Sequence, residues 1–313
     1  MTPALFAQTT LLTLLAMIAF ATNAVLCRWA LDGGWIDPVS FTSLRLASGA
    51  AMLFVVMSWM GWQQARRQRK TDSPNTVINS DSKGSWKAAF ILFVYAITFS
   101  YGYVEISTAT GALLLASVVQ LTMIGYALRN GDKLHGAEWF GAALALIGLL
   151  YLVYPKLTTP SWWGLLMVVI SAYTWALYSL NGRRSLSPLR DTAYNFYRTL
   201  PMVALASLLS LVFIEHIHLT PTGIGMAIFS GGITSSLGYI LWYKALPRIS
   251  SSLASAAQLL VPLLAAFGAT WLIDEPITLR FIIAAALMIG GLGLVLLGRN
   301  QHRKAALKRK AAF

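Results

Sequence analysis

Residues 250–297 read SSSLASAAQLLVPLLAAFGATWLIDEPITLRFIIAAALMIGGLGLVLL, and this stretch decides the fold class. Two apolar segments, Ser250–Leu272 and Thr278–Leu297, flank the acidic turn Asp274–Pro276. Each segment has close to the roughly 20 residues that a helix needs to cross a hydrocarbon core of about 30 Å. Pro262 interrupts the first segment, and a membrane helix tolerates a proline when neighbouring helices satisfy the freed carbonyl. The stretch therefore predicts a pair of membrane-spanning helices.

A similar unit occurs earlier in the chain. Residues 108–154 read TATGALLLASVVQLTMIGYALRNGDKLHGAEWFGAALALIGLLYLVY, again two apolar segments around a turn that contains an acid, Asp132. Gly148 of this copy aligns with Gly291 of the other. A repeat of this size indicates that the chain contains two copies of one structural unit. The sequence therefore predicts two related halves within a membrane.

The composition places the chain in the membrane class. Of the 313 residues 57% are hydrophobic and 11% are charged, whereas soluble domains carry about 25% charged residues. The net charge of +13 comes mainly from two runs beside apolar segments, Arg66–Lys70 and Arg299–Lys310. Such runs set topology and contact lipid headgroups. We therefore expect a lipid bilayer as partner and no nucleic acid, and the single Cys27 excludes a disulfide framework.

The apolar periodicity predicts an all-α membrane protein with ten transmembrane helices. Their expected ranges are 10–31, 38–60, 86–104, 109–129, 136–154, 161–180, 192–214, 222–243, 250–272 and 278–298. A polar cytoplasmic loop is expected at 61–85 and a basic cytoplasmic tail at 299–313.

The orientation follows from the positive charges. With ten spans both termini share one side, and nineteen of the 24 Lys and Arg residues then fall in loops and tails on that side. Because positive residues accumulate on the cytoplasmic side, we expect both termini in the cytoplasm and the chain in the cell inner membrane. Two halves of five spans each, 10–154 and 161–298, would enter the membrane from opposite sides as an inverted repeat.

The chain resembles a known family at these same positions. V-P-L at 261–263 followed by D-E-P at 274–276, with the paired positions Phe20/Trp175 and Arg45/Arg198, is similar to the EamA-type permeases of the drug/metabolite transporter superfamily. The resemblance implies ten helices around a central cavity and transport of small organic metabolites or amino acids, commonly outward. The first half departs from the pattern, because Gln120 stands near the expected proline. The register of Gln120 against Gln258 or Pro262 stays open.

Two arginines lie inside predicted spans. Arg45 and Arg198 are each about seven residues from a span end, roughly 10 Å deep by the helical rise. A central arginine costs about 2.5–3.5 kcal/mol on insertion scales. One interpretation is a cation that faces the cavity and holds a substrate carboxylate; the other is a side chain that snorkels to the headgroups. Arg28, near a span end, is interpreted as an anchor.

Other polar and aromatic residues repeat on expected inward faces. They indicate an amphipathic pocket, although small polar residues also pack helices together. The candidate cavity residues besides the two arginines are Asn23, Tyr95, Thr98, Gln120, Trp175, Tyr178, Tyr194, Asn195, Ser235, Trp242 and Gln258. Glu105 and Pro262 are the candidates for gating.

The spans contain no mid-span carboxylate and no histidine, and the chain has no nucleophile, metal or phosphate-loop motif. We therefore expect no catalytic residues, no metal and no cofactor. The function expected from the resemblance is alternating-access transport of small organic metabolites, with amino acids favoured as substrates and export as the direction. The alternative is an integral-membrane enzyme or lipid-handling protein that uses the same cavity. A monomer or weak homodimer is expected.

Overall fold

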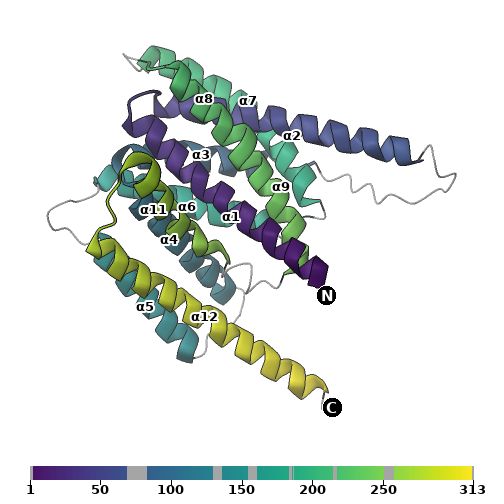
Figure 1. The fold of residues 1–313 in the computed structure, drawn as a ribbon, viewed down its shortest axis with the longest axis vertical. Helices are drawn as coiled ribbons and strands as arrows, with labels where there is room; N and C mark the ends of the chain where they lie inside the picture. Colours follow the sequence, from purple (N-terminus) through teal and green to yellow (C-terminus); the bar gives the residue numbers. More distant parts are fainter. Residues whose placement is uncertain are drawn as a thin grey trace.

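The computed structural model describes residues 3–68, 83–129, 136–153, 161–182, 185, 187–213, 217–249 and 257–311. Helices dominate this part of the chain (Figure 1), and the sole extended pairing found within it is an antiparallel bridge between Ile36 and Leu219. The all-α prediction is therefore confirmed.

A helix occupies each of the ten predicted ranges. Those of the first half are α1 (Pro3–Asp32), α2 (Pro38–Gln68), α3 (Trp86–Glu105), α4 (Thr108–Arg129) and α5 (Gly136–Val153). The second half contains α6 (Trp162–Gly182), α7 (Pro188–Phe213), α8 (Pro221–Phe229), the π-helical turn η1 (Ser230–Ser235), α9 (Ser236–Ala245), the 3₁₀ turn η2 (Leu246–Arg248), α11 (Leu260–Ile273) and α12 (Leu279–Ala311).

Seven helical segments in the described residues are long and apolar enough to cross a membrane, the stretch from Pro221 to Arg248 counting as one. Three further apolar helices are shorter, namely Gly136–Leu152, Leu260–Ile273 and Leu279–Val295. Large apolar side chains cover the outside of the bundle: Phe213 is 78% exposed and Trp271 is 76% exposed. Such a surface suits acyl chains rather than water. The protein is therefore a multi-pass membrane protein.

Two helices extend beyond their predicted ends. α2 continues to Gln68, so the expected polar loop at 61–85 is helical over its first eight residues, and residues 69–82 lie outside the described part. α12 likewise continues to Ala311 through the expected tail. Basic side chains favour a helical C-terminus, and neither 62–68 nor 299–311 contains a proline or glycine to end the helix before these points.

Local sequence sets several of the helix ends. The Asp37 carboxylate accepts from the Ser40 amide at the start of α2, Ser85 accepts from Ala88 N in α3, and Thr220 accepts from Gly223 N in α8. These are side-chain N-caps, and prolines open α2, α7 and α8. At the end of α11 Asp274 adopts the left-handed conformation, with φ 54°, and so turns the chain toward α12.

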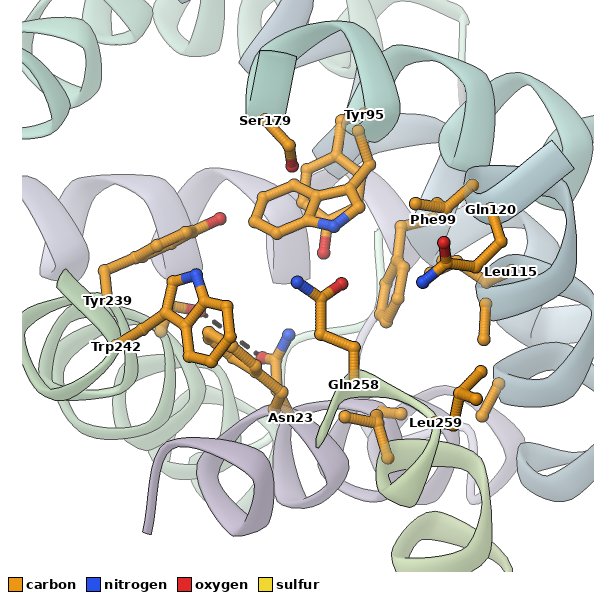
Figure 2. Close-up of a pocket in the computed structure, with 18 of the residues that line it drawn as sticks. Asn23, Tyr95, Phe99, Leu115, Gln120, Ser179, Tyr239, Trp242, Gln258 and Leu259 are labelled. Carbon is orange, nitrogen blue, oxygen red and sulfur yellow. Dashed lines mark hydrogen bonds between the residues drawn. The ribbon is translucent and has the colours of Figure 1, made fainter. Parts of the chain in front are cut away.

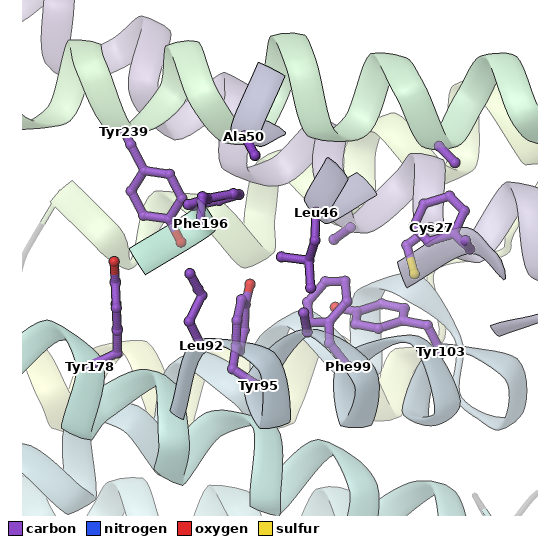
Figure 3. Packing of buried hydrophobic residues seen from close by; sticks show 14 of the residues in the cluster. Cys27, Leu46, Ala50, Leu92, Tyr95, Phe99, Tyr103, Tyr178, Phe196 and Tyr239 are labelled. Carbon is purple, nitrogen blue, oxygen red and sulfur yellow. The ribbon is translucent and has the colours of Figure 1, made fainter. Parts of the chain in front are cut away.

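The core lies between α1, α2, α3, α7 and α9. Figure 3 shows Tyr95 of α3 near Tyr239 of α9 and Phe196 of α7, with Phe99 and Tyr103 of α3 farther along, near Leu46 and Cys27. In contrast, α5 and α12 pack side by side as a pair at one margin of the bundle (Figure 1), where the backbones meet at Gly141 and Gly291. The aromatic core therefore surrounds the centre of the molecule, and the α5–α12 pair lies apart from it.

Candidate functional site

A cavity of about 110 Å³ lies at the centre of the bundle, between α1, α2, α3, α4, α6, α9 and the residues that precede α11. Side chains from all these elements point into it (Figure 2). Eight of the predicted cavity residues line it: Asn23, Arg45, Tyr95, Gln120, Trp175, Ser235, Trp242 and Gln258. The structure thus gathers residues from distant parts of the sequence around one space.

Arg45 is the charged side chain of this cavity. It is 4% exposed, its Nε donates to Ser235 Oγ at 3.3 Å and its Nη2 donates to Tyr95 Oη at 3.4 Å. The guanidinium also lies over the rings of Tyr95 and Phe99, at 5.7 and 5.0 Å from their centroids. Its Nη1 is buried without a hydrogen-bond partner among the described residues, and the ion pairs found there do not include Arg45. A cation is thus held in place with one donor unused.

Asn23 joins α1 to the π-helical turn η1. Its Oδ1 accepts from Ser230 Oγ, and it lies 3.5 Å from both Thr234 Oγ1 and Ser235 Oγ. The turn also packs directly on α2, where a Cβ at Gly231 would overlap the carbonyl oxygen of Arg45. A π-helical turn inside an α-helix is frequent at functional sites. Here it places three hydroxyls in one cluster beside the cavity.

Aromatic rings form much of the cavity wall. Trp175 lies 4.9 Å from Tyr95 and 5.6 Å from Tyr239, measured between ring centroids. Phe20, Phe99 and Tyr239 also line the cavity, and the sequence analysis did not select them. The pairing of Phe20 with Trp175 in the two halves was the one signal that could have identified a further wall residue.

Two amides face the cavity from α4 and from the residues before α11. Neither Gln120 nor Gln258 makes a hydrogen bond to another described residue, so both can bind a ligand or water. Pro262 is buried in the first turn of α11 and does not line the cavity. Because proline has no N–H, it cannot donate to the carbonyl of Gln258 four residues earlier. Pro262 thus removes the helical donor that this carbonyl would otherwise have.

Five of the predicted cavity residues lie elsewhere. Thr98 donates to the Val94 carbonyl of its own helix. Asn195 donates to Tyr178 Oη and accepts from Ser85 N, so these residues tie α6 and α7 to the start of α3. Tyr194 packs on Tyr197.

Arg198 also lies outside the cavity. It donates to the carbonyl of Lys83 and lies over the rings of Trp86 and Tyr194. The expectation that Arg198 repeats the position of Arg45 is therefore wrong. Its side chain contacts the start of α3 and the Tyr194 ring of its own helix instead of the cavity.

Next to Tyr103, which lines the cavity, lies an ion-pair cluster, which we call the Arg28–Glu275 cluster, formed by Arg28, Glu275 and the helix ends that they join. Arg28 Nε lies 3.2 Å from Glu275 Oε1, and its Nη1 donates to the carbonyls of Tyr103 and Val104 at 3.0 and 2.6 Å. Glu275 Oε2 accepts from the Thr108 amide at 2.8 Å. The cluster thereby links α1, the end of α3, the start of α4 and the turn after α11.

Glu105, a residue predicted to act in gating, is not part of this cluster. Glu105 is exposed on the surface, and no described contact involves it in closing the cavity. Glu275 and Arg28 are instead 14% and 15% exposed, beyond the Tyr103 ring that lines the cavity. At the other end the wall is formed by the last turns of α6 and α9, near the N-terminus of the chain, where Arg248 donates to Gln8.

The cavity offers binding chemistry rather than a reactive constellation. Within the described residues no group of three or more His, Cys, Asp or Glu side chains could hold a metal ion. The cavity instead combines a fixed guanidinium, amide and hydroxyl groups, and flat apolar walls. This arrangement can hold an organic anion by one end and an apolar body by the other.

Comparison with known proteins places these features in a family. The model of the EamA-like transporter family matches residues 162–297. An uncharacterised protein of Pseudomonas aeruginosa is 42% identical over 292 residues, which cover 93% of this chain and 96% of that protein. A probable terminal-alkyne amino-acid exporter of Streptantibioticus cattleyicolor is 24% identical over 94% of this chain and 96% of its own. A crystal structure with 19% identity superposes with a TM-score of 0.63 and covers 93% of this chain and 97% of that one.

Proposed function

Because this chain belongs to the EamA-like transporter family, we propose that it carries small organic carboxylates, amino acids and their derivatives among them, by alternating access through the central cavity. We propose export as the net direction. The relative from S. cattleyicolor, named as a probable amino-acid exporter, supports both the substrate class and the direction.

The observation that carries this proposal is the state of Arg45. An unpaired charge in a membrane interior is costly, so such residues usually pair or serve a function. Arg45 lines the cavity, its buried Nη1 has no partner, and its contacts found among the described residues are with neutral groups. A carboxylate would supply both the missing hydrogen bond and the opposite charge.

The topology that fits this function is the one expected from the sequence. We propose ten membrane crossings in two inverted halves, 10–154 and 161–298, with both termini on the cytoplasmic side of the cell inner membrane. The positive-charge distribution supports this orientation, and both termini lie on the same side of the molecule (Figure 1). The Arg28–Glu275 cluster then lies at the outer end and closes it, while the cavity extends toward the cytoplasm.

Counterflow in proteoliposomes tests the proposal. Vesicles loaded with one unlabelled solute and diluted into labelled solute would be compared across amino acids, organic acids, nucleosides and cationic drugs, with and without a pH gradient. We expect carboxylates to exchange, and Arg45→Ala to abolish the exchange with normal expression and insertion. Arg198→Ala is the matched control, since Arg198 lies outside the cavity. Equal exchange in wild type and Arg45→Ala would reject the proposal.

A further inference from the structure

The charge that lines the cavity, among the described residues, is positive and has no negative counterpart there. Arg45 is the one charged side chain among the described residues that line it. Seven carboxylates occur in the described part of the chain and none of them lines the cavity: Asp32, Asp37, Glu105, Glu138, Asp191, Asp274 and Glu275. The neighbouring residues 250–256, whose structure is not described, read SSSLASA and contain no acid either.

The acids nearest the two ends of this region already have partners. At the closed end, both oxygens of Glu275 are used, one by Arg28 and the other by the Thr108 amide. At the other end Asp191, whose charge acts on Tyr243 of the cavity wall, accepts from Gly84 N and Ser185 Oγ. Asp37 caps the start of α2 through Oδ1, its Oδ2 is buried without a partner among the described residues, and it lies eight residues from Arg45, or about 12 Å by the helical rise. None of these carboxylates can therefore reach a ligand at Arg45 without breaking a contact or moving its helix.

The fixed polar groups beside Arg45 also favour a negative ligand. Because the Asn23 Oδ1 accepts from the hydroxyls of η1, the part of this amide that remains for a ligand is its Nδ2 donor. Figure 2 shows that nitrogen directed toward Gln258, across the cavity. Together with the guanidinium of Arg45, whose buried Nη1 lacks a partner among the described residues, the cavity wall presents a donor and a positive charge.

We propose that the substrate is a carboxylate without a free ammonium group, such as an aryl- or alkyl-carboxylic acid or an N-acylated amino acid. This inference rests on the proposed transport of carboxylates and, within that class, favours amino-acid derivatives over free amino acids. A zwitterionic amino acid would place its ammonium group within a few ångströms of the Arg45 guanidinium, in a site where no anion compensates the lost hydration. A ligand whose amino group is acylated or absent has no second positive charge near Arg45, and the corresponding part of that ligand contacts aromatic rings and amides.

The volume of the cavity limits the size of the ligand. Its volume of about 110 Å³ is somewhat below the roughly 150 Å³ of an engineered cavity that binds benzene in another protein. A ring with a side chain exceeds this space, so the cavity must widen to admit it; Trp175 and Tyr239, whose ring centroids lie 5.6 Å apart, form one wall against which such a ring would stack. The ligand 3-phenylpropionate has this form, and phenylalanine differs from it by the ammonium group alone.

The test is a matched ligand series on the full-length protein in lipid nanodiscs. Isothermal titration calorimetry would compare 3-phenylpropionate, N-acetyl-L-phenylalanine, L-phenylalanine and 2-phenylethylamine. We expect the first two to bind and L-phenylalanine to bind at least tenfold more weakly, with 2-phenylethylamine weakest. Phenylalanine binding as tightly as 3-phenylpropionate would overturn this inference and leave carboxylate transport standing. If neither carboxylate binds, or if the amine binds best, the proposed function fails as well.

A variant pair extends the test. Asn23→Asp adds an acid beside Arg45 while keeping the oxygen that accepts from η1, so it should raise the affinity for L-phenylalanine relative to 3-phenylpropionate at least tenfold. Asn195→Asp is the matched control, since Asn195 is equally buried but lies outside the cavity, and its affinity ratio should equal that of wild type. Size-exclusion profiles would verify folding, and the wild-type series decides the question if Asn23→Asp does not fold. An unchanged ratio in folded Asn23→Asp would count against the inference.

Discussion

Glu275→Gln should loosen the closed end of the cavity. The side chain keeps its shape but replaces one carboxylate oxygen by an NH₂ group. Either the Arg28 Nε–H or the Thr108 N–H then faces a donor instead of an acceptor, because each uses a different oxygen of Glu275. The charge that attracts Arg28 is lost as well. The substitution therefore removes one charge-assisted contact and weakens another in a place that is largely shielded from water.

The expected size follows from these contacts. A hydrogen bond to a charged group contributes about 1.5–3 kcal/mol, and the partners here are 14% and 15% exposed, so solvent screens them little. At about 1.4 kcal/mol per factor of ten, the population with the outer end open should rise roughly 10- to 150-fold. The change applies only to the closed state, because the contacts join α1, α4 and the turn after α11, which must separate for the outer end to open.

The assay measures access from outside. Ala116 lines the cavity on α4, so Ala116→Cys in a Cys27→Ser background gives one reporter thiol. Glu275→Gln should raise the rate at which a membrane-impermeant thiol reagent, added outside intact cells, labels this thiol by tenfold or more.

Asp32→Asn provides the control for this measurement. Asp32 also pairs with Arg28, at 2.7 Å, but its side chain is 56% exposed. A surface pair contributes about 0–1 kcal/mol, so the labelling rate should change less than about fivefold. Equal rates in Glu275→Gln and its parent, or an effect of Asp32→Asn as large as that of Glu275→Gln, would refute the reasoning.

Two further predictions concern stability, measured as the thermal unfolding midpoint in detergent. Gly231→Ala should lower the midpoint, because the added Cβ overlaps the Arg45 carbonyl and such overpacking costs about 1–3 kcal/mol; Gly225→Ala, with open space around it, should not. Gly141→Leu should separate α5 from α12 and lower the midpoint more than Gly290→Leu, which meets no atom within 4 Å. A midpoint that is equal within either pair would contradict the packing described.

The sequence predicts the helices of this protein far better than it predicts which way they face. Apolar length alone located each helix, because a lipid-facing surface must be continuous along the span. Arg45 and Arg198 have the same depth and similar neighbours, yet one lies in the cavity and the other binds Lys83 and Trp86 outside it. The rotation of a helix about its axis depends on all its partners. When both lipid and core are apolar, the sequence carries little periodic signal for that rotation.

The closed end shows a second limit of sequence reasoning. Glu105 and Glu275 both follow an apolar span, and nothing local distinguishes them. What separates them is a contact across 247 positions: Arg28 meets Glu275 because α11 packs against α1. Such a pairing arises from tertiary structure and could be recognised only after the helices were placed.

The wide turn at 230–235 gives the eighth crossing an unusual mechanical property. A π-helical turn holds one residue more than α-helical winding needs, so losing it would rotate everything beyond it by about 100° relative to everything before it. Tyr239 and Trp242 stand on the rotating side, whereas Gly223 and Ala227 stay anchored. Deleting a single residue from η1 would rotate Tyr239 and Trp242 away from the cavity and toward the lipid, while the helix would still cross the membrane. A change in winding at η1, which packs against the backbone of Arg45, would thus change the direction in which the second half of this crossing faces.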